Sequence, residues 1–227
     1  MSDRGYEVAL FGREHREGVL RVLTPLWGDD LALNSALLKW KYEENPYADG
    51  PMGIVALRRG EVVGFRGYFA GRYEVGGREA RVLVLCPGDT CVHPEHRRRG
   101  LAGAMGRLAF EAFPSEFRLF LNMSSNEKAL PGYLAMGFVP VGLKAYTSCY
   151  EYANVLRFLL GGGRRARPGS EQSGRTSRCR IHIDDSPWPK EMAEIAAARE
   201  PAGGRLRLAQ DEVFFSWRFG NPGMDYL

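Results

Sequence analysis

Three short apolar segments between residues 54 and 85 constrain the fold more than any other feature of this sequence. Glycine-containing turns at Arg59-Gly60 and Gly76-Gly77 separate them. Short runs of this kind, bounded by turn residues, indicate β-strands. The expected strands are Ile54–Leu57, Val62–Phe69 and Arg81–Leu85. The middle of the chain is therefore built around a sheet.

The flanking segments alternate between helical and strand patterns. A first helix is expected at 14–23, ended by Pro25, and a second begins with Asn34 or Ser35 as its N-cap. The remaining expected elements are helices at Leu101–Phe113 and Glu127–Met136, and strands at Tyr6–Phe11, Arg118–Asn122, Phe138–Leu143 and Tyr146–Tyr152. This order predicts an α/β fold of the α+β mixed-sheet kind.

The composition does not call for a metal or a disulfide to hold such a domain together. Of the 227 residues 44% are hydrophobic, which is enough for a core. The four cysteines form no Cys-x-x-Cys pair. Cys86 and Cys91 are an odd number of residues apart, so on a regular strand they would lie on opposite faces. We predict no metal site, although His93 and His96 lie nearby.

The regular patterns stop near residue 155. Residues 156–180 are rich in Gly, Arg and Ser without periodicity, which is typical of a flexible basic linker. Because residues 161–180 have no interleaved aromatic residues and the formal net charge is only +4, we do not expect nucleic acid as a partner. We therefore expect a domain at 1–155 and a further segment at 181–227.

The segment 181–227 repeats a pattern from the start of the chain. Leu37-Leu38-Lys39-Trp40-Lys41-Tyr42 precedes Asn45-Pro46, and Phe214-Phe215-Ser216-Trp217-Arg218-Phe219 precedes Asn221-Pro222. Chance similarity of two amphipathic helices is the alternative. Only five residues follow Pro222, so we expect an incomplete second copy of the first domain, as in a truncated tandem protein. It would dock on the first domain, pair with another chain as in a homodimer, or stay partly disordered, and would contribute no catalytic residue.

The stretch from Asp89 to Gly103 carries the chemistry. Its sequence is D-T-C-V-H-P-E-H-R-R-R-G-L-A-G, in which a strand leads through a turn into a helix that opens with small residues. The first N–H groups of a helix have no intrahelical partners, and that end of the helix dipole is positive. The stretch therefore suits a pyrophosphate. The alternative is a glycine-rich helix start with solvated arginines. It is neither a Walker loop nor a dinucleotide fingerprint.

This stretch resembles motif A of the GNAT superfamily of acetyl-CoA-dependent N-acyltransferases. The matching residues are Val92-x-Pro94-x-x-Arg97-Arg98-Arg99-Gly100-Leu101-Ala102. The resemblance implies that Val92 and Arg97 to Gly103 bind acetyl-CoA, with the pyrophosphate on the backbone amides. It covers roughly residues 5–152 and implies the GNAT fold, so the segment 181–227 would be a partial GNAT-like repeat.

A second stretch is similar to motif B of the same superfamily. It reads Asn126-x-x-Ala129-x-x-x-Tyr133-x-x-x-Gly137-Phe138. The resemblance implies that Asn126 faces the pantetheine arm of the cofactor. It also implies that Tyr133 is the general acid that protonates the departing thiolate. The alternative is that Tyr133 only packs one face of a helix and that Gly137 is its C-cap.

An amine must lose a proton before it attacks a thioester, and a nearby carboxylate can accept that proton. Asp89 is the candidate base because it lies late on a strand, just before motif A; the alternative is that it caps a turn or bulge. Asp29 and Asp30 would either hold a cationic substrate or start a helix.

These features predict an N-acetyltransferase that moves an acetyl group from acetyl-CoA to a primary amine through a ternary complex. The alternative is an acyl-CoA-binding module of a tandem protein with little or no activity. The start of the chain is polar and no apolar run reaches the length of a bilayer. We therefore expect a cytoplasmic protein with no membrane partner.

Overall fold

The computed structural model describes residues 5–76, 80–113, 117–123, 127–141, 187–198 and 206–224. Within these residues six strands form one sheet, five of them in the order β1-β2-β3-β4-β5. Strands β1 to β4 pair antiparallel, and β5 pairs parallel with β4. The five strands are β1 (Tyr6–Leu10), β2 (Gly53–Arg58), β3 (Glu61–Val75), β4 (Ala80–Val92) and β5 (Phe117–Phe120).

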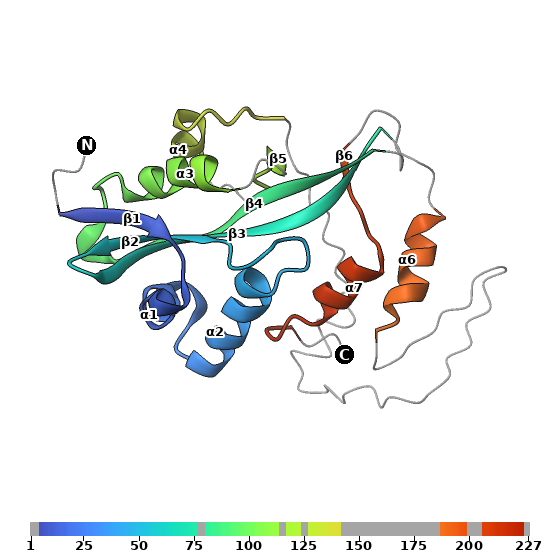
Figure 1. Ribbon diagram of the computed structural model, residues 1–227, viewed down its shortest axis with the longest axis horizontal. Coiled ribbons are helices and arrows are strands. Elements are labelled where there is room, and N and C mark those ends of the chain that lie inside the picture. The colour runs from blue at the N-terminus through green and yellow to red at the C-terminus, as the bar shows by residue number, and fades with distance from the viewer. Residues whose placement is uncertain are drawn as a thin grey trace, which may run out of the picture. The chain divides into compact units, whose positions relative to one another are not determined.

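Helices cover both faces of this sheet (Figure 1). One face carries α1 (Arg16–Trp27) and α2 (Leu31–Leu38), and the other carries α3 (Leu101–Ala112) and α4 (Leu130–Ala135). Each face has its own core. The first core includes Val19, Leu23, Leu38 and Phe65, and the second includes Ile54, Tyr68, Leu85, Leu101 and Met105. The mixed α/β architecture expected from the sequence is confirmed. None of the helices in the described ranges is long and apolar enough to cross a membrane.

Two helix boundaries differ from those expected. Helix α1 runs through Pro25 to Trp27, because a proline in the last turn removes only one backbone hydrogen bond. Helix α2 begins after Asp30, whose carboxylate accepts a hydrogen bond from the Leu33 N–H at 2.9 Å. Asn34 is not the cap; it lies buried inside the helix and donates to the Gly28 carbonyl at 2.7 Å. Asp30 therefore starts a helix.

A π-helical turn, Lys39–Glu43, follows α2. Its hydrogen bond runs from the Glu44 N–H to the Lys39 carbonyl, five residues back, at 2.8 Å. Such a turn inserts one extra residue compared with an α-helix. It brings Tyr42 fully into the core, between the glycines Gly67 on β3 and Gly88 on β4, where a Cβ would collide with the Tyr42 side chain.

A bulge in β4 changes which side chains share a face. Arg66 of β3 lies opposite Thr90, but Tyr68 lies opposite Pro87, so β4 carries one extra residue between them. As a result Cys91 pairs with Phe65 and Cys86 pairs with Phe69, four residues further along β3. The expectation of opposite faces for Cys86 and Cys91 is therefore wrong, because the bulge shifts the alternation by one.

Helix α4 is shorter than expected, since residues 127–129 form turns before it. Residues 138–141 are described but form no strand. The expected strand at 146–152, the end of the strand at 138–143 and the linker 156–180 lie outside the described residues. Asn126 lies outside them as well.

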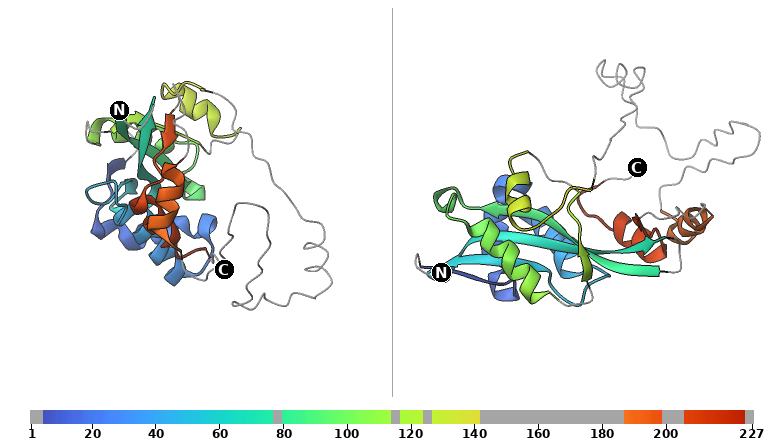
Figure 2. Two further views of the ribbon diagram at one scale, coloured as in Figure 1. Left: turned by 90° about the vertical axis from the view of Figure 1, so that its right-hand side faces the viewer. Right: turned by 90° about the horizontal axis from the view of Figure 1, so that it is seen from above.

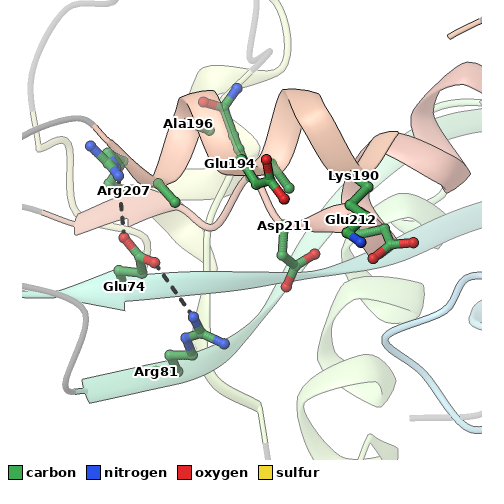
Figure 3. A pocket seen from close by; sticks show the side chains of 11 residues that line it. Glu74, Arg81, Lys190, Glu194, Ala196, Arg207, Asp211 and Glu212 are labelled. Carbon is green, nitrogen blue, oxygen red and sulfur yellow. Dashed lines mark hydrogen bonds and ion pairs between the residues drawn. The ribbon is translucent and has the colours of Figure 1, made fainter. Parts of the chain in front are cut away.

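The C-terminal residues pack against the far end of the β3–β4 hairpin (Figure 2). They form α6 (Pro189–Ala197), β6 (Leu206–Leu208) and α7 (Glu212–Phe219). Strand β6 pairs antiparallel with Tyr73–Val75 of β3. Together with the first 139 residues they belong to one compact unit. Figure 3 shows Glu74 at this seam, where it contacts Arg207 of β6 at 3.4 Å and Arg81 of β4 at 3.9 Å.

Candidate active site

The loop before α3 presents its backbone to solvent. Gly100 is the N-cap of α3 and has a left-handed backbone with φ 76°. The first hydrogen bond of the helix runs from the Ala104 N–H to the Gly100 carbonyl at 3.0 Å. The N–H groups of Leu101, Ala102 and Gly103 therefore precede the intrahelical ladder and are open to a ligand. Apart from the two chain neighbours, no described atom lies within 4 Å of a Cβ built on Gly100, so there is open space beside the start of the helix.

The three arginines of this loop are exposed, and two of them contact the loop itself. The Arg97 Nε atom donates to the Val92 carbonyl at 3.0 Å, and the Arg99 Nη2 atom donates to the Glu95 carbonyl at 3.3 Å. Arg98 holds a left-handed backbone with φ 60°. The Leu101 side chain is buried in the core on the α3 face. Leu101 would therefore serve a cofactor through its N–H group, and the loop would provide backbone donors with positive charge beside them.

A histidine anchors this loop to the first strand. The buried His96 receives or donates a hydrogen bond through Nδ1 with the Tyr6 hydroxyl at 2.8 Å. Desolvation lowers the pKa of His96, and the nearby Arg58 acts in the same direction. His93, Glu95 and His96 place potential ligand atoms within 4.8 Å of one another. Our expectation of a metal-free site stays a prediction.

Asp89 lies in the β4 bulge and is held by the π-helical turn. Its Oδ2 atom accepts a hydrogen bond from the Tyr42 hydroxyl at 2.7 Å and pairs with the Lys41 ammonium at 2.8 Å. The Asp89 N–H in turn donates to the Tyr42 hydroxyl at 2.9 Å. Burial, followed by the negative charge of Asp89, raises the pKa of Tyr42 well above its ordinary value, so Tyr42 stays a donor. The Asp89 side chain is 20% exposed and remains within reach of a small molecule.

Tyr133 lies on α4, close to the start of α3. Its ring packs edge-on against Phe138 with 5.0 Å between centroids. The guanidinium of Arg66 lies 4.9 Å from the centroid of the same ring. Arg66 also donates to the carbonyl of Ala102 at 3.1 Å. Arg66 therefore links the predicted acid to the helix start that carries the predicted cofactor site.

Lys41, Tyr42 and Arg66 were not predicted as site residues from the sequence. One signal was present in the sequence: Arg66 and Gly67 interrupt an otherwise apolar strand, and Gly88 precedes Asp89. Glycines inside strands often mark the close approach of another group. The partner of those glycines, Tyr42, comes from a turn that no periodicity predicts.

The chain is similar to several solved acetyltransferase structures at low identity. An acetyltransferase of Trypanosoma brucei is 20% identical with a TM-score of 0.46, over 63% of this chain and 99% of the other. The aminoglycoside N-acetyltransferase AAC(6')-Iy in complex with CoA is 19% identical with a TM-score of 0.47, over 66% of this chain and 99% of the other. Glucosamine-6-phosphate N-acetyltransferase of Arabidopsis thaliana is 9% identical with a TM-score of 0.46, over 63% of this chain and 97% of the other. No curated protein sequence matches the chain.

The family of the chain is shown by a match to its amino-acid sequence, over the part that forms most of the sheet and the loop before α3. A family model for the acetyltransferase (GNAT) domain matches residues 15–130. That range begins just before α1, includes strands β2 to β5 and the whole Val92–Gly103 loop, and ends at the start of α4. It spans more than half of the 227 residues. This chain belongs to the GNAT acetyltransferase family.

Proposed function

We propose that the protein transfers an acetyl group from acetyl-CoA to a primary amine by direct attack within a ternary complex. The observation that carries this proposal is the open row of N–H groups at Leu101, Ala102 and Gly103, preceded by the left-handed Gly100. Backbone donors at the positive end of a 12-residue helix fit a pyrophosphate. Acetyl-CoA would supply the activated acetyl group as a thioester. Arg97, Arg98 and Arg99 would add positive charge along the same edge.

Two side chains would move the protons. The amine nitrogen forms a bond to the acetyl carbon while the carbon–sulfur bond breaks. Asp89 would accept the proton that the amine loses, directly or through a water. Lys41 and Tyr42 are bonded to its Oδ2 atom, and among the described residues none is bonded to Oδ1, which would take the proton. Tyr133 would give its phenolic proton to the departing thiolate. Asn126 is proposed to hold the pantetheine arm.

The experiment that tests this function is release of free CoA, measured with acetyl-CoA and a panel of amines. Tyr133→Phe removes one hydroxyl, so we expect acetyl-CoA affinity to survive while turnover falls about 10²-fold, at the low end for general acid catalysis. Tyr73→Phe is the control. Tyr73 lies near the C-terminal end of β3, whereas Arg66, the β3 residue that contacts Tyr133, lies in the middle, so this substitution should not affect turnover. Asp89→Asn should slow the reaction most at low pH, where neutral amine is scarce.

Full activity in Tyr133→Phe would remove that role from Tyr133. Binding of acetyl-CoA without turnover for any amine would favour the alternative, an acyl-CoA-binding module.

We also propose that the C-terminal residues are a partial copy of the first domain. Asn45 and Asn221 each accept a hydrogen bond on Oδ1 from the N–H two residues on, at 3.0 and 2.9 Å. Their carbonyls each accept from the N–H three residues on, at 3.2 and 3.3 Å. The first copy has one more residue between its tryptophan and its Asn-Pro pair, and the π-helical turn accommodates that residue. These matched turns support a common origin over chance similarity.

A further inference from the structure

Arg66 is a buried cation whose charge is not balanced locally. Its residue is 3% exposed, in the middle of β3. One guanidinium nitrogen donates to the Ala102 carbonyl, whereas the buried Nε atom has no hydrogen-bond partner in the part of the chain that the structure describes. Among the described residues, no carboxylate lies within ion-pair distance of it. Burying a charge without an opposite charge is costly. A residue retained under that cost is a candidate for function.

The surroundings of the guanidinium consist of aromatic faces and a helix start. It lies 4.9 Å from the ring centroid of Tyr133 and 5.7 Å from that of Tyr68. Cations are attracted to ring faces, so both contacts are favourable. Burial raises the pKa of Tyr68 to about 12, which keeps Tyr68 neutral at physiological pH. Arg66 thus places a positive charge against both rings.

The packing of α3 makes room for this arrangement. A Cβ on Gly106 would lie 3.1 Å from an Arg66 guanidinium nitrogen and would collide with the sulfur of Met136. Met136 directly follows α4, the helix that carries Tyr133. The absence of a side chain at Gly106 thus lets α4 approach α3 with Arg66 between them. The Arg66 side chain thus connects β3 with α3, which carries the predicted cofactor site, and with α4, which carries Tyr133.

We infer that Arg66 is a positioning residue for acetyl transfer, which orients Tyr133 and supplies the positive charge beside it when its phenol gives up a proton. This inference rests on the proposed function, in which Tyr133 protonates the departing thiolate. A phenolate left on Tyr133 would face the buried guanidinium of Arg66, and charge interactions are stronger where a charge is removed from water. The guanidinium touches the ring and the helix start, so its effect on the reacting atoms passes through Tyr133.

Steady-state kinetics separate this role from simple packing. Arg66→Met keeps most of the volume and removes the charge, so we expect kcat to fall roughly 10-fold while the KM for acetyl-CoA changes little. Arg66→Lys should recover part of the loss because it keeps the charge. Arg72→Met is the control: Arg72 is also on β3 and also lies over a tyrosine ring, at 5.3 Å from Tyr47, but it pairs with Asp211, whereas Arg66 contacts α3. Arg72→Met should leave kcat unchanged.

The double variant decides whether Arg66 acts through Tyr133. In a Tyr133→Phe background, Arg66→Met should cause no further loss of kcat, because the phenol it serves is absent. An equal loss in both backgrounds, or an unchanged kcat in Arg66→Met, would overturn the inference while leaving acetyl transfer itself in place. An absence of turnover in the wild-type chain would instead remove the proposed function.

The position of the Tyr133 ring can also be tested by NMR, without measuring turnover. In protein labelled with 3-fluorotyrosine, the ¹⁹F signal of Tyr133 is identified by its loss in Tyr133→Phe. We expect Arg66→Met to shift and broaden that signal, Arg66→Lys to shift it less, and Arg72→Met to leave it in place. If Arg66→Met does not fold, the comparison of Arg66→Lys with wild type in both assays still decides. A Tyr133 signal that stays in place in the folded Arg66 variants would exclude the positioning role.

Discussion

Gly100 and Gly60 form a matched pair for testing the cofactor site at the level of single residues. Both have a left-handed backbone, with φ 76° and 81°, and neither has an atom within 4 Å of a built Cβ. Valine at either position should therefore cost about 1–2 kcal/mol in backbone strain. Only Gly100→Val places a branched side chain beside the open N–H groups of α3, so calorimetry should show loss of acetyl-CoA binding there and not in Gly60→Val. Equal affinities in the two folded variants would contradict the site assignment.

The buried thiol of Cys86 should make the stability of the protein depend on pH in the alkaline range. Desolvation raises the pKa of its thiol from about 9 to about 11, partly opposed by a hydrogen bond with Tyr73. Between these values the unfolded chain has lost the proton and the folded chain still holds it, so the free energy of unfolding should fall as pH rises. Below about pH 9 this contribution is fully present. Urea titrations from pH 8 to pH 11 should show a weaker pH dependence in Cys86→Ala than in wild type.

The same thiol offers a chemical check. At pH 8.5 an alkylating reagent should modify Cys86 slowly in the native protein and rapidly in urea, because the thiolate is the reactive form and the native thiol is buried. Mass spectrometry of proteolytic peptides distinguishes Cys86 from the other cysteines. Rapid native labelling of Cys86 would show that this part of β4 is open to solvent.

At the scale of elements, the π-helical turn and α7 are joined by a reciprocal contact. The Trp40 indole donates to the Trp217 carbonyl at 2.7 Å, and the Trp217 indole donates to the Trp40 carbonyl at 3.1 Å. The two rings stack with 4.8 Å between centroids. Each substitution removes the ring stacking, and each removes one of the two hydrogen bonds. Because the stacking can be lost only once, Trp40→Ala and Trp217→Ala should together destabilise the protein by about 1 kcal/mol less than the sum of their separate effects.

Urea unfolding of the two single variants and the double variant measures this coupling. Trp27 provides the control, since it stacks on Tyr42 and has no described contact with Trp217. Trp27→Ala and Trp217→Ala should therefore be additive. Additivity in the Trp40 and Trp217 pair would mean that the contact between the two elements contributes little to stability.

The elements also show what a sequence reveals and what it does not. The strands at 54–57, 62–69 and 81–85 and the helix after Gly100 follow from patterns within a few residues, and the structure contains all four. The β4 bulge and the π-helical turn each insert one residue, and no periodicity marks them. They nevertheless decide that Cys86 and Cys91 share a face and that Tyr42 reaches Asp89. Contacts such as Trp40 with Trp217, 177 residues apart, depend on how distant segments pack.

At the scale of the whole molecule, the C-terminal residues belong to the same compact unit as the sheet. Asp211 caps α7 by accepting from the Phe214 N–H at 2.9 Å, and it also accepts from the Tyr47 hydroxyl at 3.0 Å and from Arg72 at 3.1 Å. Strand β6 pairs with the part of β3 that β2 does not reach, so it covers an open edge. These contacts lie on β3, the π-helical turn and the loop after it. The described hydrogen-bond partners of Arg97 and Arg99 lie within the loop before α3. The Tyr133 ring contacts Phe138 and Arg66, and Arg66 lies in the middle of β3, outside the Tyr73–Val75 segment that β6 covers.

That separation predicts how the protein responds when the C-terminal residues are removed. A chain ending at Gly161 should still bind acetyl-CoA with an affinity within about threefold of the full chain, a difference below 1 kcal/mol. It should unfold at lower urea concentration, because Trp40 and the edge of β3 lose their cover. Asp211→Ala in the full chain is the companion variant, since it weakens the docking without shortening the chain. It should lower stability and leave acetyl-CoA affinity unchanged. If the shortened chain folds but no longer binds acetyl-CoA, and Asp211→Ala weakens binding in parallel, the C-terminal residues form part of the active site.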